Sequence, residues 1–108
     1  MKLDDYQELA LKTSATYSNA AQELAVLCLG LTGESGEVAD LVKKTIGHGH
    51  QLNVNKVRYE LGDVLWYLAV LSNAVGSSLS EIAEMNVNKL KKRYPDGFSE
   101  ERSINREE

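Results

Sequence analysis

Four carboxylates, in two pairs with the same spacing, are the residues of this sequence best suited to chemistry. Glu34 and Glu37 form the first pair, and Glu60 and Asp63 form the second. A spacing of three residues puts both carboxylates of a pair on one face of a helix, one turn apart. Because like charges repel, two such pairs facing each other require cations. Oxygen ligands without histidine or cysteine favour Mg²⁺, with Mn²⁺ as a substitute, over zinc or copper.

The helices that carry these carboxylates are expected to be partly buried. In each segment the apolar residues recur every three or four positions, which is the pattern of a buried stripe. Glu34 falls on the first stripe, three residues after Leu31, and Glu60 lies four residues before Val64 on the second. Both pairs are therefore expected to point inward or toward a groove. The competing interpretation is that they are surface acids on amphipathic helices.

The whole chain is expected to be all-α, with four helices in a bundle that oligomerisation completes. The first helix is expected from Asp4 or Asp5 to about Ala15, and the second from about residue 21 to Ile46. Asn53 or Asn55 would cap the third, which runs to about Ala74, and Ser80 would cap the fourth, which Pro95 ends. Glycines at 30, 33 and 36 interrupt the second helix. It is either continuous or broken near Gly33, and the surviving apolar register favours continuity.

Composition limits the possible roles of the chain. Its 108 residues fit one domain, which we expect to span residues 1–98 and to be followed by a charged tail at 99–108. The net charge of −4 argues against a nucleic acid polymer as partner. No signal segment and no apolar run of membrane-spanning length is found, so we expect a cytoplasmic protein without membrane contact. The single cysteine, Cys28, lies on an apolar stripe and is expected to be a packed core thiol.

A line of polar and cationic residues follows one side of the fourth helix. Asn86, Lys89 and Arg93 recur at intervals of three and four. Lysine and arginine suit phosphate oxygens, and asparagine can donate a hydrogen bond to them. A solvated surface favoured by the helix dipole is the alternative interpretation.

In three blocks the sequence resembles the all-α nucleoside triphosphate pyrophosphohydrolases, the MazG-like group. The blocks are Leu31 to Glu37, Glu60 to Tyr67, and Asn86 to Pro95. The resemblance implies a helical bundle that binds Mg²⁺ through Glu34, Glu37, Glu60 and Asp63, assembled as a homodimer or homotetramer. It also implies hydrolysis of a nucleoside triphosphate to the monophosphate and pyrophosphate, in nucleotide pool control or house-cleaning.

The chemistry of the residues agrees with that reaction. An acidic site binds a triphosphate only through bridging metals. Glu37 or Glu34 would act as the catalytic base, and Lys89 and Arg93 would hold the phosphates, either within one subunit or from a neighbour. A di-iron bundle is excluded because neither acidic pair is a Glu-x-x-His motif.

Two alternatives stay open, a phosphoribosyl-ATP pyrophosphatase and a non-catalytic helical module that binds nucleotides or mediates oligomerisation. The loop residues His48 and His50 could lie near the entrance of the site but are interpreted as surface residues. Tyr6, Gln7 and Thr13 could line a base pocket but are interpreted as packing or capping residues.

Overall fold

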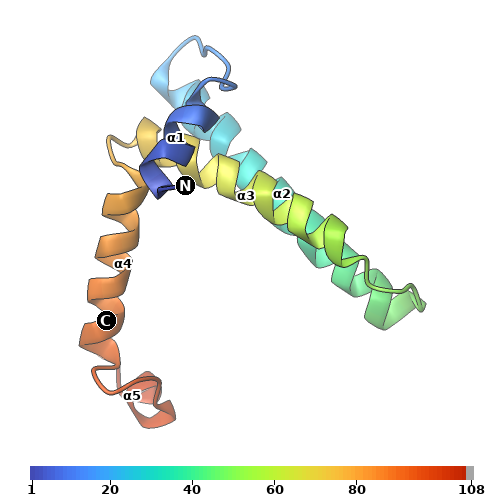
Figure 1. The fold of residues 1–108 in the computed structure, drawn as a ribbon, viewed down its shortest axis with the longest axis vertical. Coiled ribbons are helices and arrows are strands. Elements are labelled where there is room, and N and C mark those ends of the chain that lie inside the picture. The colour runs from blue at the N-terminus through green and yellow to red at the C-terminus, as the bar shows by residue number, and fades with distance from the viewer. Residues whose placement is uncertain (107–108) are drawn as a thin grey trace.

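A computed structural model describes residues 1–106, which form five helices and no β-strand (Figure 1). The helices are α1 (Leu3–Leu11), α2 (Ala20–His48), α3 (Val54–Ala74), α4 (Leu79–Arg93) and α5 (Glu100–Ile104). The all-helical class expected from the sequence is confirmed. The segment expected to be a charged tail contains the short helix α5. Within residues 1–106, no helical segment combines the length and hydrophobicity of a transmembrane span.

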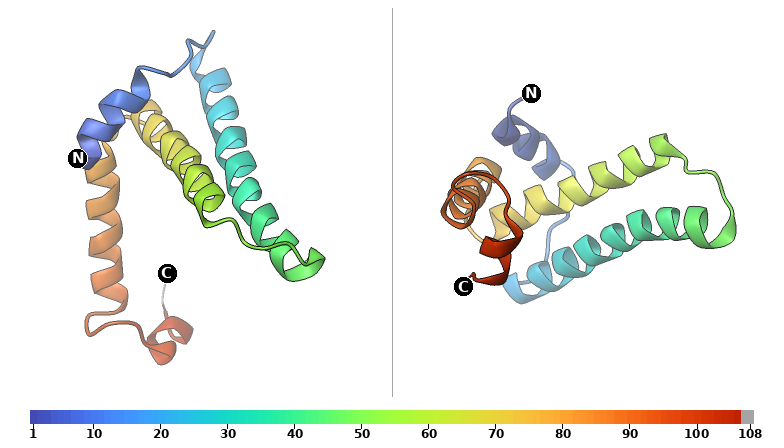
Figure 2. Two further views of the ribbon diagram at one scale, coloured as in Figure 1. Left: turned by 45° about the vertical axis from the view of Figure 1, so that its right-hand side comes forward. Right: turned by 90° about the horizontal axis from the view of Figure 1, so that it is seen from below.

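The long helices α2 and α3 lie side by side and run in opposite directions (Figures 1 and 2). α2 continues through Gly30, Gly33 and Gly36, as its apolar register predicts. It ends where Gly49 adopts a left-handed conformation with φ of 73°, a geometry that a residue without Cβ reaches without strain. A short loop of residues 49–53 then returns the chain into α3. This pairing brings the two acidic segments together.

Side-chain caps mark where α2, α3 and α4 begin. The Asn19 side chain accepts a hydrogen bond from the Gln22 amide at the start of α2, and Asn53 does the same for Lys56 at the start of α3. The fourth helix is capped by Ser78, two residues earlier than expected. The first helix ends at Leu11, four residues earlier than predicted, and the Thr13 hydroxyl donates to the carbonyl of Ala10 just beyond it.

The core is small and lies where α1 crosses the paired helices. Its buried apolar residues are Ala10, Leu27, Ala69, Val70 and Leu79. Gln7 is buried among them and joins three elements. Its amide nitrogen donates to the carbonyls of Ala69 and Ser77, at 3.0 and 3.2 Å, and its oxygen accepts from the Leu79 amide. The expectation that Gln7 serves packing agrees with these contacts, which fix α1 and the start of α4 against α3.

Beyond its first turns, α4 extends away from the α2–α3 pair as a separate arm (Figures 1 and 2). The chain is consequently much more open than a compact domain. Its radius of gyration is 17.0 Å, against about 13 Å for a compact chain of this length. Its accessible surface is 8113 Å², against about 5,900 Å² for a monomeric protein of this mass.

Large apolar side chains lie on this open surface. Leu29 is 73% exposed and Met85 is 67% exposed. The expectation of a buried Cys28 thiol is wrong, because in this chain that side chain is exposed. α2 packs against α3 along one face only, so a residue on the edge of its apolar stripe is left uncovered.

Candidate metal centre

Carboxylates from α2 and α3 meet at the seam between the two helices. One carboxylate oxygen each from Glu34, Glu60 and Asp63 lies within 4.8 Å of the others. Glu34 and Glu60 are half-buried, whereas Asp63 is exposed. The antiparallel pairing joins positions 26 and 29 residues apart in sequence into one acidic cluster. We call these three residues the acidic cluster.

The electrostatics of the acidic cluster fit a bound cation. The pKa of Glu34 is raised above its ordinary value of 4.5, chiefly by a hydrogen bond with Glu60, then by burial and by the negative charges of Asp63, Glu60 and Glu37. Among residues 1–106, the ion pairs formed join Lys43 and Lys44 to Asp40, and none involves the cluster. Three oxygen donors without a cationic neighbour are the ligand type that a hard divalent cation prefers.

Glu37 lies outside the acidic cluster. It is exposed, and its carboxylate is not among the oxygens that lie within 4.8 Å of one another. Its negative charge still acts on Glu34, one turn before it on α2. Both pairs were expected to point inward or toward a groove, and Asp63 does lie with Glu34 and Glu60 at the seam, although Asp63 and Glu37 are exposed in a single chain. Within a single chain, the site faces solvent at the edge of the helix pair.

A close contact one turn away sets the spacing of the two helices at the site. Gly30 lies four residues before Glu34, and Tyr67 lies four residues after Asp63. A Cβ atom added at Gly30 would overlap the Cε1 and Cζ atoms of the Tyr67 ring. The ring therefore packs directly on the backbone of α2, and a larger residue at position 30 would force the two helices or the ring to move.

Aromatic residues lie beside the acidic cluster. The pKa of Tyr6 is raised by burial and by the negative charge of Asp63, so its hydroxyl lies in the electrostatic field of the site. The Trp66 indole donates to the Thr13 hydroxyl at 2.7 Å, and its ring meets Tyr67 edge-on with centroids 4.9 Å apart. The sequence gives no signal for the position of Tyr6, because that position depends on how α1 docks on α3.

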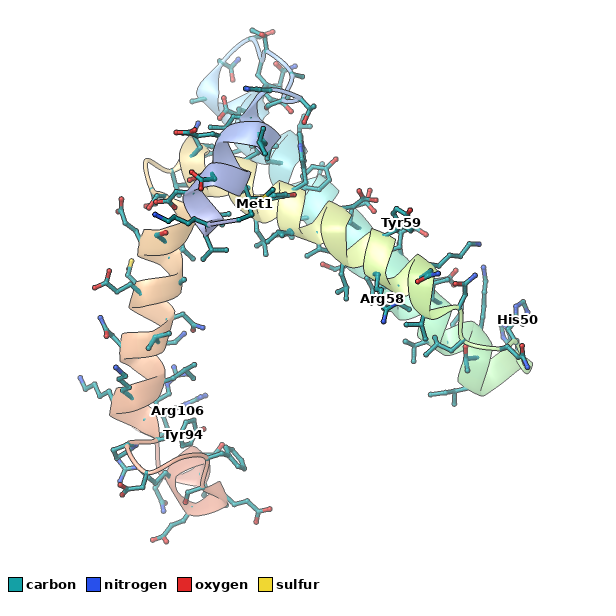
Figure 3. The ribbon with its side chains drawn as sticks, in the orientation of Figure 1. Met1, His50, Arg58, Tyr59, Tyr94 and Arg106 are labelled. Atoms are coloured by element: carbon teal, nitrogen blue, oxygen red, sulfur yellow. The ribbon has the colours of Figure 1, made fainter. Side chains whose placement is uncertain are left out.

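The cationic line of the fourth helix does not reach the acidic cluster within one chain. Asn86 and Lys89 are exposed and Arg93 is half-buried, and all three lie on the α4 arm. The two histidines that were expected in a loop also lie away from the acidic cluster. His48 is the last residue of α2, and Figure 3 shows His50 at the tip of the α2–α3 pair.

Comparison with known proteins agrees with this arrangement of helices and carboxylates. The family model of the MazG nucleotide pyrophosphohydrolase domain matches residues 22–98, a range that includes the acidic cluster and all of α4. The Gene 37 protein of Mycobacterium phage L5 is 36% identical over 115 residues, covering 98% of this chain and the whole of that protein. No solved structure matches the chain. Since the family match spans most of the sequence, this chain belongs to the MazG nucleotide pyrophosphohydrolase family.

Proposed function

We propose that this protein is a Mg²⁺-dependent nucleoside triphosphate pyrophosphohydrolase. It would convert a ribo- or deoxyribonucleoside triphosphate of the cytoplasmic nucleotide pool to the monophosphate and pyrophosphate. The observation that carries the proposal is the meeting of Glu34, Glu60 and Asp63 within 4.8 Å at the α2–α3 seam. A triphosphate is itself strongly negative, so such a site can bind it only together with a cation.

We assign different roles to the four carboxylates. Glu34, Glu60 and Asp63 would hold Mg²⁺, with Mn²⁺ as a substitute. The bound ion would supply Lewis-acid stabilisation of charge on the phosphoryl oxygens. Glu37 is the better candidate for the base, because it lies outside the acidic cluster yet close enough for its charge to raise the pKa of Glu34. Such a carboxylate can accept a proton from the attacking water.

A second copy of the chain would complete the site. Asn86, Lys89 and Arg93 lie on the α4 arm, away from the acidic cluster of their own chain, so we propose that they contact the phosphates bound by a neighbouring subunit. The open shape supports this. The excess of about 2,200 Å² over the surface of a compact monomer is in the range that an obligate interface buries per subunit. The assembly would be a homodimer or homotetramer.

A substrate panel tests the reaction. Nucleoside and deoxynucleoside triphosphates, together with phosphoribosyl-ATP, are incubated with protein and Mg²⁺, and products are identified by phosphorus NMR. We expect monophosphate and pyrophosphate, with loss of turnover in Glu60→Gln and normal turnover in Glu8→Gln, which removes an exposed carboxylate on α1. Release of diphosphate and orthophosphate, or full activity of Glu60→Gln, would contradict the proposal.

Mixing two inactive variants tests the shared site. In a mixed assembly of Glu60→Gln and Lys89→Gln chains, one site pairs an intact acidic cluster with an intact α4 arm, while the other site carries both changes. We therefore expect activity to return when the two variants are unfolded, mixed and refolded together. Continued inactivity of the mixture, with each variant still folded and assembled, would place Lys89 outside the site of a neighbouring subunit.

A further inference from the structure

The α4 arm leaves the rest of the chain at its first turn, and two amide groups of that turn donate to side chains of α1. The first amides of a helix lack partners within the helix and need acceptors from elsewhere. The Leu79 amide donates to the Gln7 Oε1 atom at 3.2 Å. The Ser80 amide donates to the Asp4 Oδ1 atom at 3.0 Å. Helix α1 therefore caps α4, although the bonded residues lie more than seventy positions apart in sequence.

Little else fixes the direction of the arm. Within α4, Leu79 is the one buried residue, and apolar side chains further along the helix, such as Met85, are exposed. The connection from α3 turns through Gly76, whose φ of 78° lies in the left-handed region. α4 contacts α1 and α3, and Figures 1 and 2 show that both helices meet it near its start. The direction of the arm is consequently set within its first turn.

A small rotation at this first turn moves the far end of the arm by several ångströms. Arg93 lies 13 residues after Ser80, which is about 20 Å along a helix that rises about 1.5 Å per residue. A rotation of about 10° at the start would move Arg93 by about 3 Å and Lys89 by about 2 Å. Hydrogen bonds from these cations to phosphate oxygens need finer placement, because their donor–acceptor distances vary by only a few tenths of an ångström.

We propose that Asp4 is a positioning residue of the active site. By accepting a hydrogen bond from the Ser80 amide, it fixes the direction in which α4 carries Lys89 and Arg93 to the triphosphate of a neighbouring subunit. This inference rests on the proposed function, which assigns those two side chains to the phosphates. Asp4 acts through the helix that it caps and contacts neither the substrate nor the metal.

Asp4 separates this positioning role from folding better than Gln7 does. Gln7 is buried and also bonds to the backbone of α3 and of Ser77, so its loss destabilises the core. Asp4 is exposed, and within residues 1–106 its side chain forms a single hydrogen bond, the one from Ser80. Asp5 provides the matched control. It is the other carboxylate in the first turn of α1, is exposed, and forms no hydrogen bond or ion pair among the described residues.

Steady-state kinetics with Mg²⁺ and the best triphosphate of the substrate panel test this role. Asp4→Ala and Asp5→Ala each remove one carboxylate from the first turn of α1, so they change the net charge and the interaction with the helix dipole alike. We expect Asp4→Ala to raise KM about tenfold, as for weakened charged hydrogen bonds, with a smaller change in kcat because the acidic cluster is intact. Asp5→Ala should keep the wild-type KM. Asp4→Asn retains an oxygen that can accept from Ser80 and should restore the KM.

A mixed assembly shows on which site Asp4 acts. Asp4→Ala chains are refolded with an excess of Glu60→Gln chains, so that most Asp4→Ala chains pair with a Glu60→Gln chain. The competent site then joins the acidic cluster of the Asp4→Ala chain to an α4 arm whose cap is intact. We expect the KM of this mixture to return to the wild-type value. A KM that stays raised would overturn the proposal, because Asp4 would then act on the acidic cluster of its own chain.

The direction of the arm can be measured without any reaction. Nitroxide labels on Cys28, which is exposed on α2, and on a Lys91→Cys substitution on α4 report the distance between these helices by pulsed EPR. An excess of unlabelled protein restricts the signal to labels within one chain. We expect the same distance distribution with and without Asp5→Ala, and a broader or shifted distribution with Asp4→Ala. An unchanged distribution with Asp4→Ala, or an equal change with Asp5→Ala, would overturn the proposal.

The two readouts distinguish a failure of this inference from a failure of the proposed function. If the wild type hydrolyses the triphosphate while Asp4→Ala keeps both the wild-type KM and the wild-type distances, only the role of Asp4 fails. If the wild type hydrolyses none of the triphosphates, the proposed function fails, and the role of Asp4 in the reaction fails with it.

Discussion

Replacing Gly30 with alanine perturbs the contact that sets the α2–α3 spacing. In the structure, the added Cβ would overlap the Tyr67 ring, which is half-buried and packs against the core. The neighbouring Gly33 provides a matched control on the same helix, because a Cβ atom there meets nothing within 4 Å. Both substitutions make the same chemical change in a helix interior. Only the Cβ atom added at Gly30 would contact a residue of α3.

The size of the effect follows from two opposing contributions. Replacing glycine with alanine in a helix interior stabilises by about 1 kcal/mol. Forcing extra volume into a packed contact costs about 1–3 kcal/mol. Gly33→Ala is therefore expected to raise the free energy of unfolding by about 1 kcal/mol. Gly30→Ala is expected to lie about 1–3 kcal/mol below Gly33→Ala, because it carries the packing cost as well.

Urea unfolding in EDTA, followed by circular dichroism, measures this difference. A second measurement is Mg²⁺ affinity. The Gly30 contact lies one turn from Glu34 and Asp63, so we expect Gly30→Ala to weaken metal binding and Gly33→Ala to weaken it less. Shortening Tyr67 to leucine should remove the penalty of Gly30→Ala. Equal stability of Gly30→Ala and Gly33→Ala would refute the argument that Tyr67 packs on the α2 backbone.

Two further predictions concern buried and titrating polar groups. Gln7→Leu leaves the backbone partners of the Gln7 amide unpaired, so its free energy of unfolding should fall by about 1–3 kcal/mol, whereas Gln51→Leu, at an exposed loop position, should change it much less. The pKa of Glu34 in the folded protein lies above its ordinary 4.5, so the fold holds a proton that the unfolded chain releases, and stability falls as pH rises through the folded pKa. In EDTA, the free energy of unfolding of the wild type should therefore decline relative to that of Glu34→Gln as the pH rises through the folded pKa of Glu34. If the free energies of unfolding of the two proteins change with pH in parallel, the hydrogen bond between Glu34 and Glu60 does not raise that pKa.

Features encoded within one helix, or within two helices joined by a short loop, were predictable from the sequence. Features set by docking of more distant segments, or by how far one helix covers another, were not. The continuity of α2 follows from an apolar register that persists across its glycines, and the pairing of Glu34 with Glu60 and Asp63 follows from two amphipathic helices joined by a short loop. The exposure of Cys28 does not follow, because a stripe shows which face is apolar without showing how much of it one neighbour covers.

The position of α1 is a second feature without a local signal. Gln7 bonds to Ala69, 62 residues away, and no periodic pattern links the two. The direction of α4 is equally absent from its own sequence. Its apolar residues are compatible with a closed bundle in one chain or with contacts to another copy, and the helix is an open arm in this structure.

The short connection between α2 and α3 has a consequence for the order of events in folding. Contacts between these helices join nearby parts of the chain, whereas α1 reaches partners more than sixty residues away, and local contacts generally form with a smaller loss of chain entropy. The helical hairpin would then assemble early, bringing its negative side chains together in the rate-limiting step. A divalent ion that offsets their repulsion would then accelerate refolding and leave the unfolding rate little changed.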